Sequence, residues 1–151
     1  MLDDLCLDVD NNRSTAQILL DLSTAFDTDD HSILVDRLVS CRLFGSALLR
    51  LHSFINWHIQ AVQIGDHMSP LAVLGCGLPQ GSLLSLLLFN IYLQPLISSL
   101  AAMDCRVYNY ADDTQLLLRM DNSSSSHANA QAILRFINHW MNTNSLKLNP
   151  D

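Results

Sequence analysis

The sequence predicts an α+β fold in which helices pack on one face of a largely antiparallel sheet. Segments with strand-like and helix-like apolar patterns follow one another in the order strand, helices, hairpin, helix, hairpin, helix. Of the 151 residues, 49% are hydrophobic and 15% are charged. This composition supplies a sizeable core and excludes disorder over most of the chain. The length fits one domain or part of a larger one.

The first half of the chain predicts a helix end, a strand and two helices. Residues 1–15 read as the end of a helix and a polar turn. The apolar run "AQILLDLS" (16–23) ends in an aspartate and predicts a central strand covered on both faces. In the next segment, we expect Asp30 or Ser32 to cap a helix and Gly45 to end it. "SALLRLHSFINWHIQ" predicts a second helix.

The second half predicts two hairpins and two helices. "AVQIGDHMSPLAVLGC" (61–76) is typical of a hairpin with Gly65 and Asp66 near its turn. "GLPQGS" breaks the chain and opens a long apolar helix. "CRVYNYADDTQLLLRM" (105–120) predicts two strands with a tight turn at Ala111 and Asp112, and "DNSSSSHAN" predicts a polar loop. "AQAILRFINHWMN" predicts an amphipathic helix, and "SLKLN" predicts the start of a last strand.

Charge and composition exclude several classes of protein. The formal net charge of -7 argues against a free-standing nucleic-acid binder and suits a site that holds cations. The four cysteines are scattered, which indicates neither a zinc site nor a disulfide framework. The acidic N-terminus lacks the pattern of a signal peptide, so we expect an intracellular protein of the nucleus or cytoplasm that is not secreted.

Residues 81–103 form the stretch most similar to a membrane span. Asn90, Gln94 and Pro95 interrupt it, whereas a spanning helix requires roughly 20 mostly apolar residues. A buried core helix is therefore the prediction, and no membrane partner is expected. A membrane anchor is the alternative.

Three aspartates lie at the ends of predicted apolar strands. Asp112 and Asp113 are adjacent in the second hairpin, and Asp21 ends the first strand. Carboxylates that converge in this way repel one another, and Mg²⁺ resolves the conflict because it prefers carboxylate oxygens. Two such ions about 4 Å apart assist phosphoryl transfer. The alternative is structural: Asp21 caps the following helix, and Asp112 with Asp113 serves a turn.

Three motifs occur in a recognisable order: "LLDLSTAFDTDDHSILVDRL", "GLPQGSLLSLLLFNIYLQPL" and "YNYADDTQLLL". They resemble the successive motifs of reverse transcriptases (RNA-directed DNA polymerases) of non-LTR, LINE-type retrotransposons. The resemblance covers essentially the whole chain. It implies a polymerase palm with part of the fingers.

The resemblance implies roles for the three aspartates. Asp21 matches the first catalytic aspartate of the palm, and Asp112 and Asp113 match the pair of the Tyr-Ala-Asp-Asp box. In the family, these residues hold two Mg²⁺ ions. The implied reaction is attack of a primer 3′ hydroxyl on a deoxynucleoside triphosphate, with RNA as template, a DNA primer and pyrophosphate leaving.

The resemblance also implies four nucleotide-binding residues. Phe26 matches the aromatic gate that rejects a 2′ hydroxyl; otherwise it is a core aromatic. Gln80 and Gly81 belong to the loop along the nucleotide; otherwise they form an ordinary Gly-Pro turn. The helix N-terminus after Gly81 offers N–H groups to phosphate. Tyr110 matches a residue near the primer end; otherwise it is a strand aromatic.

The sequence departs from the family pattern at several points. Asp29 stands where the family usually has an apolar residue, often Val. Residues 1–151 are expected to form a partial reverse transcriptase domain, a palm core without the start of the fingers and the thumb. Lys147 is a candidate proton donor to pyrophosphate. The alternative function is an inactive retrotransposon-derived remnant or an interaction module.

Overall fold

The computed structural model describes residues 2–11, 13–23, 25–56, 58–110, 113–121 and 123–149. The chain divides into two compact units. Unit 1 comprises residues 1–24 and 93–151, and unit 2 comprises residues 25–92. Both contain helices and short antiparallel strands, so the α+β class is confirmed.

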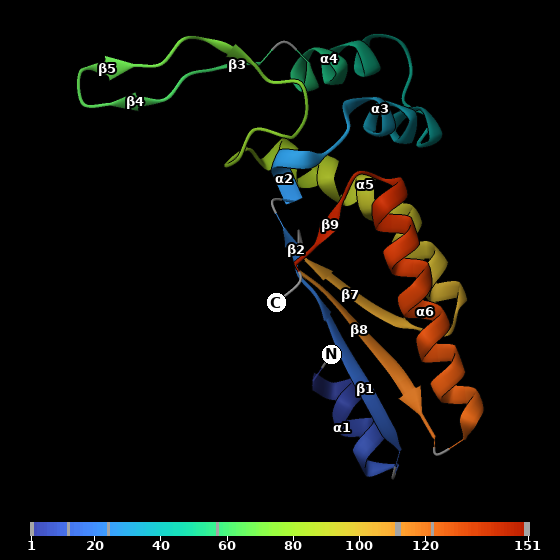
Figure 1. Cartoon of the computed structure of the whole chain (residues 1–151). Helices are drawn as coiled ribbons and strands as arrows, with labels where there is room; N and C mark the ends of the chain where they lie inside the picture. The colour runs from blue at the N-terminus through green and yellow to red at the C-terminus, as the bar shows by residue number, and fades with distance from the viewer. Residues whose placement is uncertain are drawn as a thin grey trace. The chain divides into compact units, whose positions relative to one another are not determined.

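The sheet of unit 1 has three antiparallel strands in the order β1-β8-β7 (Figure 1). These are β1 (Ser14–Leu20), β8 (Asp113–Met120) and β7 (Arg106–Tyr110). The expectation of two strands over residues 105–120 is confirmed, while their turn lies outside the described residues. The expectation that β1 is a central strand was wrong: β1 is an edge strand, and its Leu19 is 67% exposed. The apolar run reflects one covered face and an exposed leucine, not two covered faces.

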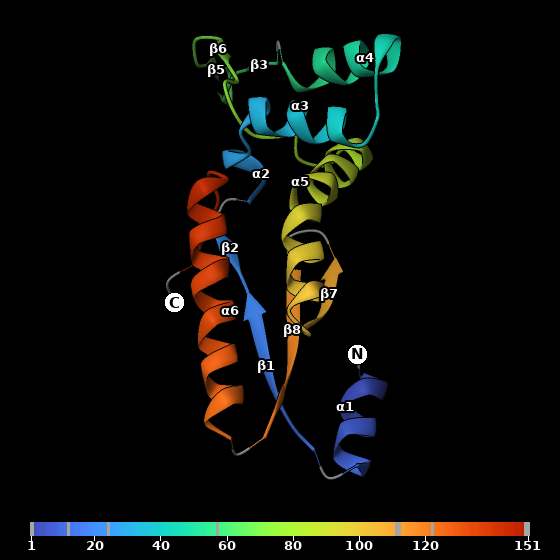
Figure 2. The same ribbon diagram turned by 90° about the vertical axis from the view of Figure 1, so that its right-hand side faces the viewer.

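One face of this sheet forms the core of unit 1. Leu20, Leu116 and Leu118 are buried on it, since the register places their side chains on the same face. Helix α6 (Ser124–Thr143) and the C-terminal half of α5 (Leu83–Ala102) cover this face (Figure 2). The expected amphipathic stripe of α6 is confirmed, since its buried side chains recur at helical spacing: Ile133, Ile137, Trp140 and Met141.

Helix α1 (Leu2–Asp10) lies on the opposite face of the sheet (Figure 1). Its Asp8 is buried, with 3% of the residue exposed. The Asp8 carboxylate accepts hydrogen bonds from Thr15 and Arg106 and lies 3.9 Å from the Arg119 guanidinium. The Arg106 hydrogen bond, followed by that of Thr15, lowers the pKa of Asp8. The expectation of helices on one face alone was therefore wrong, because ion pairs and hydrogen bonds fasten a short helix to the second face.

Two further short strands extend unit 1. Strand β2 (Leu22–Ser23) pairs antiparallel with β9 (Lys147–Leu148). The expected last strand is thereby confirmed. This ladder brings the C-terminal segment beside the chain that follows β1.

Unit 2 begins with three helices: α2 (Ala25–Thr28), α3 (His31–Ser40) and α4 (Gly45–Ile55). The Asp30 carboxylate accepts from the Ser32 and Ile33 amides, so the expected cap of α3 is confirmed. Gly45 was expected to end this helix, and that expectation was wrong. The helix ends at Ser40, Arg42 adopts φ 61°, and Gly45 opens α4.

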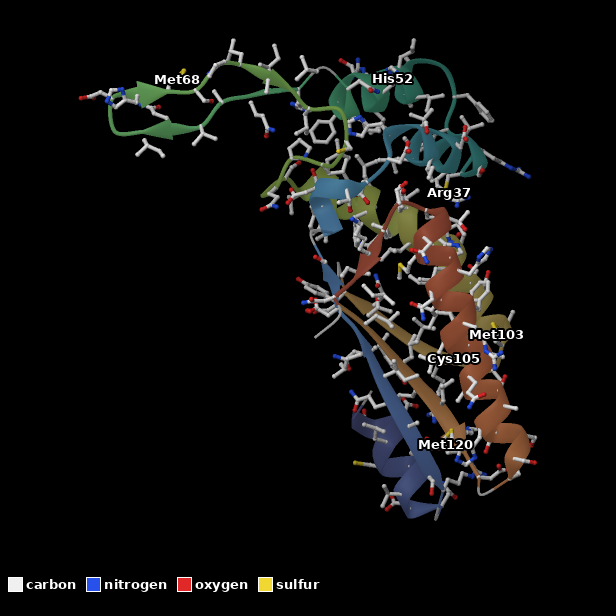
Figure 3. The ribbon with its side chains drawn as sticks, in the orientation of Figure 1. Arg37, His52, Met68, Met103, Cys105 and Met120 are labelled. Carbon is white, nitrogen blue, oxygen red and sulfur yellow. The ribbon has the colours of Figure 1, made fainter. Side chains whose placement is uncertain are left out.

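The hairpin predicted for residues 61–76 is present in unit 2 as two short ladders. Strand β3 (Ile59–Gln60) pairs with β6 (Ala72–Val73), and β4 (Gln63–Ile64) pairs with β5 (His67–Met68). Gly65 and Asp66 form the turn. Large apolar side chains are exposed along it, including Met68 on the outer ladder (Figure 3).

Among the described helices, α5 is the one that is long and apolar enough to cross a membrane. Many of its residues instead belong to the protein core: Leu88, Phe89, Tyr92, Leu93, Leu96 and Leu100. The prediction of a buried core helix is confirmed for these positions.

The polar segment before the last helix was expected to be a loop. Helix α6 instead begins at Ser124, within the serine run. The Ser123 side chain accepts from the Ser126 amide and caps the helix. Serine favours both loops and helix starts, so this boundary was placed too late.

Candidate functional site

Two of the predicted site aspartates lie at one end of the unit 1 sheet. The register between β1 and β8 pairs Leu20 with Thr114. The ladder ends at this pair; the next residue along each strand is Asp21 and Asp113, which the same register would set opposite each other. Opposite residues of antiparallel strands have Cα atoms about 4.5 to 5.5 Å apart and project to the same face. Asp21 and Asp113 thus adjoin the last pair of the ladder, and both residues are exposed.

The aspartates share the face that α5 and α6 do not cover. Thr114, Leu116 and Leu118 point toward the core, so Asp113 and Gln115 point away from it. Tyr110 pairs with Asp113 and is 78% exposed. A shallow pocket of about 230 Å³ lies on this side, lined by Tyr108, Asn109, Tyr110, Asp113 and Gln115.

Asp21 is held by the C-terminal segment. The Asn149 side-chain amide donates to the Asp21 carboxylate at 2.9 Å, and the Asn149 backbone N–H donates to the Asp21 carbonyl at 2.9 Å. Lys147 pairs with Ser23 in the adjacent ladder. One carboxylate oxygen of Asp21 is thus oriented by the Asn149 amide.

The described residues contain no group of three or more metal-ligating side chains close enough to hold an ion. The third predicted aspartate, Asp112, lies outside the described residues. The pair that is described nevertheless fits Mg²⁺ in its chemistry, because both members offer carboxylate oxygens at an exposed strand end.

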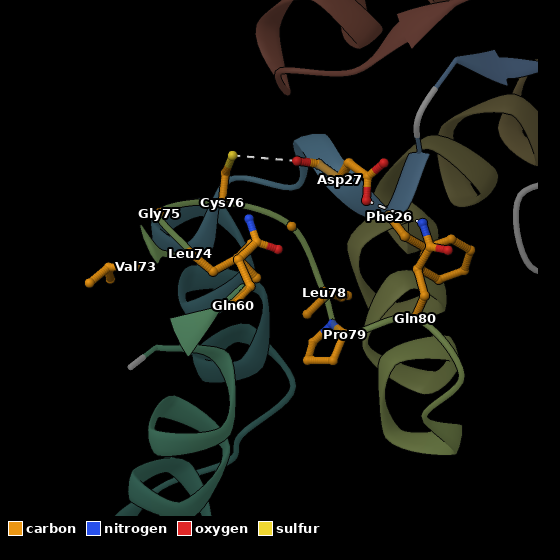
Figure 4. A pocket seen from close by; sticks show the side chains of 11 residues that line it. Phe26, Asp27, Gln60, Val73, Leu74, Gly75, Cys76, Leu78, Pro79 and Gln80 are labelled. Atoms are coloured by element: carbon orange, nitrogen blue, oxygen red, sulfur yellow. Dashed lines mark hydrogen bonds between the residues drawn. The ribbon is translucent and has the colours of Figure 1, made fainter. Parts of the chain in front are cut away.

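Unit 2 contains a second candidate region, a pocket of about 590 Å³ (Figure 4). Phe26 and Asp27 form part of its wall, and the loop from Leu74 to Gln80 forms most of the rest. The Gln80 side-chain amide donates to the Asp27 carboxylate at 3.2 Å. The Cys76 thiol donates to the Asp27 carbonyl at 3.4 Å. The loop is therefore fastened to α2, the helix that carries Phe26.

Phe26 packs against the core of unit 2 and also lines the pocket. Its ring contacts Phe89 of α5, with centroids 4.8 Å apart and planes at 38°. It also lines the pocket. The ring is half-buried, so core packing holds it while part of it remains accessible.

The two glycines of the loop have different surroundings. At Gly77, φ is 83° and an added Cβ would lie 2.7 Å from the Phe26 carbonyl oxygen. At Gly81, φ is also 83°, but an added Cβ would meet nothing within 4 Å. The loop therefore approaches the backbone of Phe26 and Asp27 closely at Gly77, whereas Gly81 has open space beside it.

Asp29 is fully buried in unit 2, and both of its carboxylate oxygens lack a hydrogen-bond partner among the described residues. Burial raises the pKa of Asp29 to about 7, with a further contribution from the charge of Asp27. The sequence marked this charge as unusual, and the structure shows that it is not solvated.

Sequence reasoning missed several residues of these two regions. Asn149 orients Asp21, Asp27 binds Gln80, and His31 contacts the loop at Gly77. The last strand was predicted, but nothing in its sequence indicated the register that brings Asn149 to Asp21. Asp27 and His31 lie in the same sequence motif as Phe26, and that motif was the signal that could have found them. Only Phe26 was assigned a role from it.

The chain belongs to the reverse transcriptase (RNA-dependent DNA polymerase) family, whose sequence model matches residues 3–151. This confirms the resemblance to the reverse transcriptases of LINE-type retrotransposons. Among individual proteins, the chain is similar to the RNA-directed DNA polymerase from mobile element jockey of Drosophila melanogaster, with 24% identity over 149 residues. The match covers 95% of this chain and 16% of that relative.

Proposed function

We propose that the chain is the palm region, with part of the fingers, of an RNA-directed DNA polymerase. One observation supports this proposal most strongly: within a chain of this family, the β1–β8 ladder ends at Leu20 and Thr114, directly beside Asp21 and Asp113, which belong to the face that α5 and α6 do not cover. Like charges placed opposite each other destabilise a sheet, so the pair is best understood as a cation site.

Asp21, Asp112 and Asp113 are the proposed ligands of two Mg²⁺ ions. Bound Mg²⁺ would neutralise phosphate charge and favour the ionised form of a primer 3′ hydroxyl. Within the chain, the Asn149 side chain orients the Asp21 carboxylate, and the pairing of β1 with β8 sets the spacing of the two strand ends. Preorganisation of this kind avoids reorientation during reaction.

Phe26, Gln80, Gly81 and Tyr110 are the proposed nucleotide and primer contacts. The unit 2 pocket supports the roles of Phe26 and Gln80, because both line it and Asp27 holds Gln80 in place. The exposed ring of Tyr110 beside Asp113 supports a contact near the primer end. An RNA template, a DNA primer and deoxynucleoside triphosphates are the corresponding partners, and an intracellular location remains a prediction.

Primer extension on an RNA template tests the proposal. We expect Mg²⁺-dependent incorporation by the purified chain, and loss of at least ~100-fold in Asp21→Asn and Asp112→Asn, because each removes a charged metal ligand. Asp36→Asn is the matched control, since Asp36 is an exposed aspartate in the middle of α3. Absence of incorporation at every Mg²⁺ concentration would instead support a remnant without activity.

A further inference from the structure

In unit 2, residues 26–31, which run from α2 to the first residue of α3, are joined to the loop at residues 76–80 by several hydrogen bonds. Two of them connect backbones: the Gly77 N–H donates to the Asp29 carbonyl at 2.8 Å, and the Leu78 N–H donates to the Phe26 carbonyl at 2.6 Å. Cys76 and Gln80 add the two contacts to Asp27 described above. The two segments therefore behave as one structural element around the pocket.

His31 makes a further contact, which differs from those of Cys76 and Gln80 because it is buried. Its Nε2 lies 2.8 Å from the Gly77 carbonyl oxygen, and the residue is 8% exposed. A carbonyl only accepts, so Nε2 carries the hydrogen of this bond. Since a buried carbonyl left without its donor is costly, the contact contributes more than an exposed hydrogen bond of the same length.

Both partners of this bond are fixed by their surroundings. His31 is the first residue of α3, and the Asp30 side chain caps that helix through the Ser32 amide at 2.8 Å. Gly77 is packed so closely on α2 that an added Cβ would lie 2.7 Å from the Phe26 carbonyl oxygen. A shift of the Gly77 carbonyl is therefore resisted by packing on one side and by His31 on the other.

The geometry points to His31 as a positioning residue for nucleotide binding. It holds Gly77, and with it the loop that carries Gln80, against the helix that carries Phe26. The histidine does not line this pocket, so the role that we assign to it is one of positioning. The inference rests on the proposed function, because it assigns a purpose to the pocket wall only if a nucleotide binds there.

Three variants of the full chain test the inference: His31→Leu, His31→Gln and His31→Asn. Leucine removes the donor, glutamine offers a donor amide near the position of Nε2, and asparagine is polar but too short to reach. His127→Leu is the matched control, since the His127 ring also bonds a backbone carbonyl, that of Ser123, but is exposed on α6. Amide hydrogen exchange at Gly77 and Leu78 and steady-state primer extension are measured on each.

We expect His31→Leu and His31→Asn to exchange the Gly77 and Leu78 amides about tenfold faster, corresponding to the loss of one hydrogen bond. The KM for the nucleotide should rise by a similar factor, while kcat stays within about twofold, because the metal ligands are untouched. His31→Gln should restore both values to within about threefold of the wild type. His127→Leu should change neither.

Each of the other possible results contradicts a particular part of the inference. Unchanged amide exchange in both His31→Leu and His31→Asn overturns the role of His31 in holding the loop. Faster exchange with an unchanged KM overturns its role in nucleotide binding. A wild-type chain without incorporation overturns the proposed function, and the exchange rates then still decide whether His31 holds the loop. If His31→Leu fails to fold, the comparison of His31→Gln with His31→Asn decides in its place.

Discussion

The side-chain amide of Asn149 donates a hydrogen bond of 2.9 Å to the carboxylate of Asp21. The two residues are 128 positions apart in the sequence, and the β2–β9 ladder brings them together. This contact fixes the rotamer of an exposed carboxylate. It therefore links the C-terminal segment to the proposed metal site.

Replacement of Asn149 by alanine should weaken Mg²⁺ binding without abolishing activity. Loss of one orienting hydrogen bond costs about 1 kcal/mol, so the Mg²⁺ concentration for half-maximal incorporation should rise about fivefold. A Mg²⁺ titration of primer extension measures this value. Asn138→Ala is the control, because Asn138 is exposed on α6 and bonds only the Leu134 carbonyl among the described partners. An equal shift in both variants would refute the role of Asn149.

Neutralisation of Asp113 should stabilise the chain in the absence of metal. Asp113→Asn relieves repulsion between opposite carboxylates and should raise Tm by about 2 °C in EDTA. Addition of Mg²⁺ should raise the Tm of the wild type but not that of the variant, since a ligand stabilises only the state that binds it. A Tm of the variant that rises with Mg²⁺ as in the wild type would place the ion elsewhere.

Asp29 should make the stability of the fold depend on pH. Its pKa is about 7 in the folded chain against 3.8 for the ordinary group. Between pH 4 and pH 7 the folded chain holds the proton that the unfolded chain has released, so stability falls as pH rises through this window. Above pH 7 the full cost of a buried charge is present.

Asp29→Asn removes this charge with almost no change in shape. At pH 8 it should raise the free energy of unfolding by about 2 to 4 kcal/mol, and near pH 4 the difference should disappear. Denaturant unfolding at the two pH values measures the effect, with the exposed Asp36→Asn as control. A gain of the same size at both pH values would mean that burial of the charge is not its cause.

Gly77 and Gly81 offer a matched pair for testing the close approach of the two segments in unit 2. Both have φ of 83°, but only Gly77 lacks space for a Cβ. Gly81→Ala should cost about 1 kcal/mol from backbone strain alone, whereas Gly77→Ala should cost about 3 kcal/mol because the added atom also meets the Phe26 carbonyl. Unfolding in urea distinguishes them. Equal losses would show that the segments separate readily at this point.

The sequence predicted the parts of the fold that depend on local pattern. Apolar periodicity, turn residues and the Asp30 cap located most strands and helices. It did not predict which strand is central, because an apolar run such as Ile18–Leu20 arises both in a buried strand and in an edge strand with an exposed leucine. It also missed the side of the sheet on which α1 lies, since that is decided by Asp8 and its distant partners Arg106 and Arg119.

The sequence predicted a set of residues for the candidate site, whose roles stay predictions, but it did not indicate the residues that support them. Asp21 and Asp113 were expected to meet because each lies at the end of an apolar strand. Asn149 and His31 were not assigned roles, because their contacts are made across 128 and 46 positions. In a sequence, a polar residue of a short motif looks the same whether it is a surface residue, a helix cap or a side chain that supports a site. Only its tertiary contacts distinguish these roles.

The hairpin of unit 2 also has a practical consequence. Its large apolar side chains, Ile59, Val62, Ile64, Met68, Leu71 and Val73, are each more than 60% exposed. Such a surface favours adsorption to phenyl-substituted resins and retention at high ammonium sulfate. The substitutions Ile64→Ser and Leu71→Ser would shorten retention on the resin. They would also yield a preparation better suited to assays at high protein concentration.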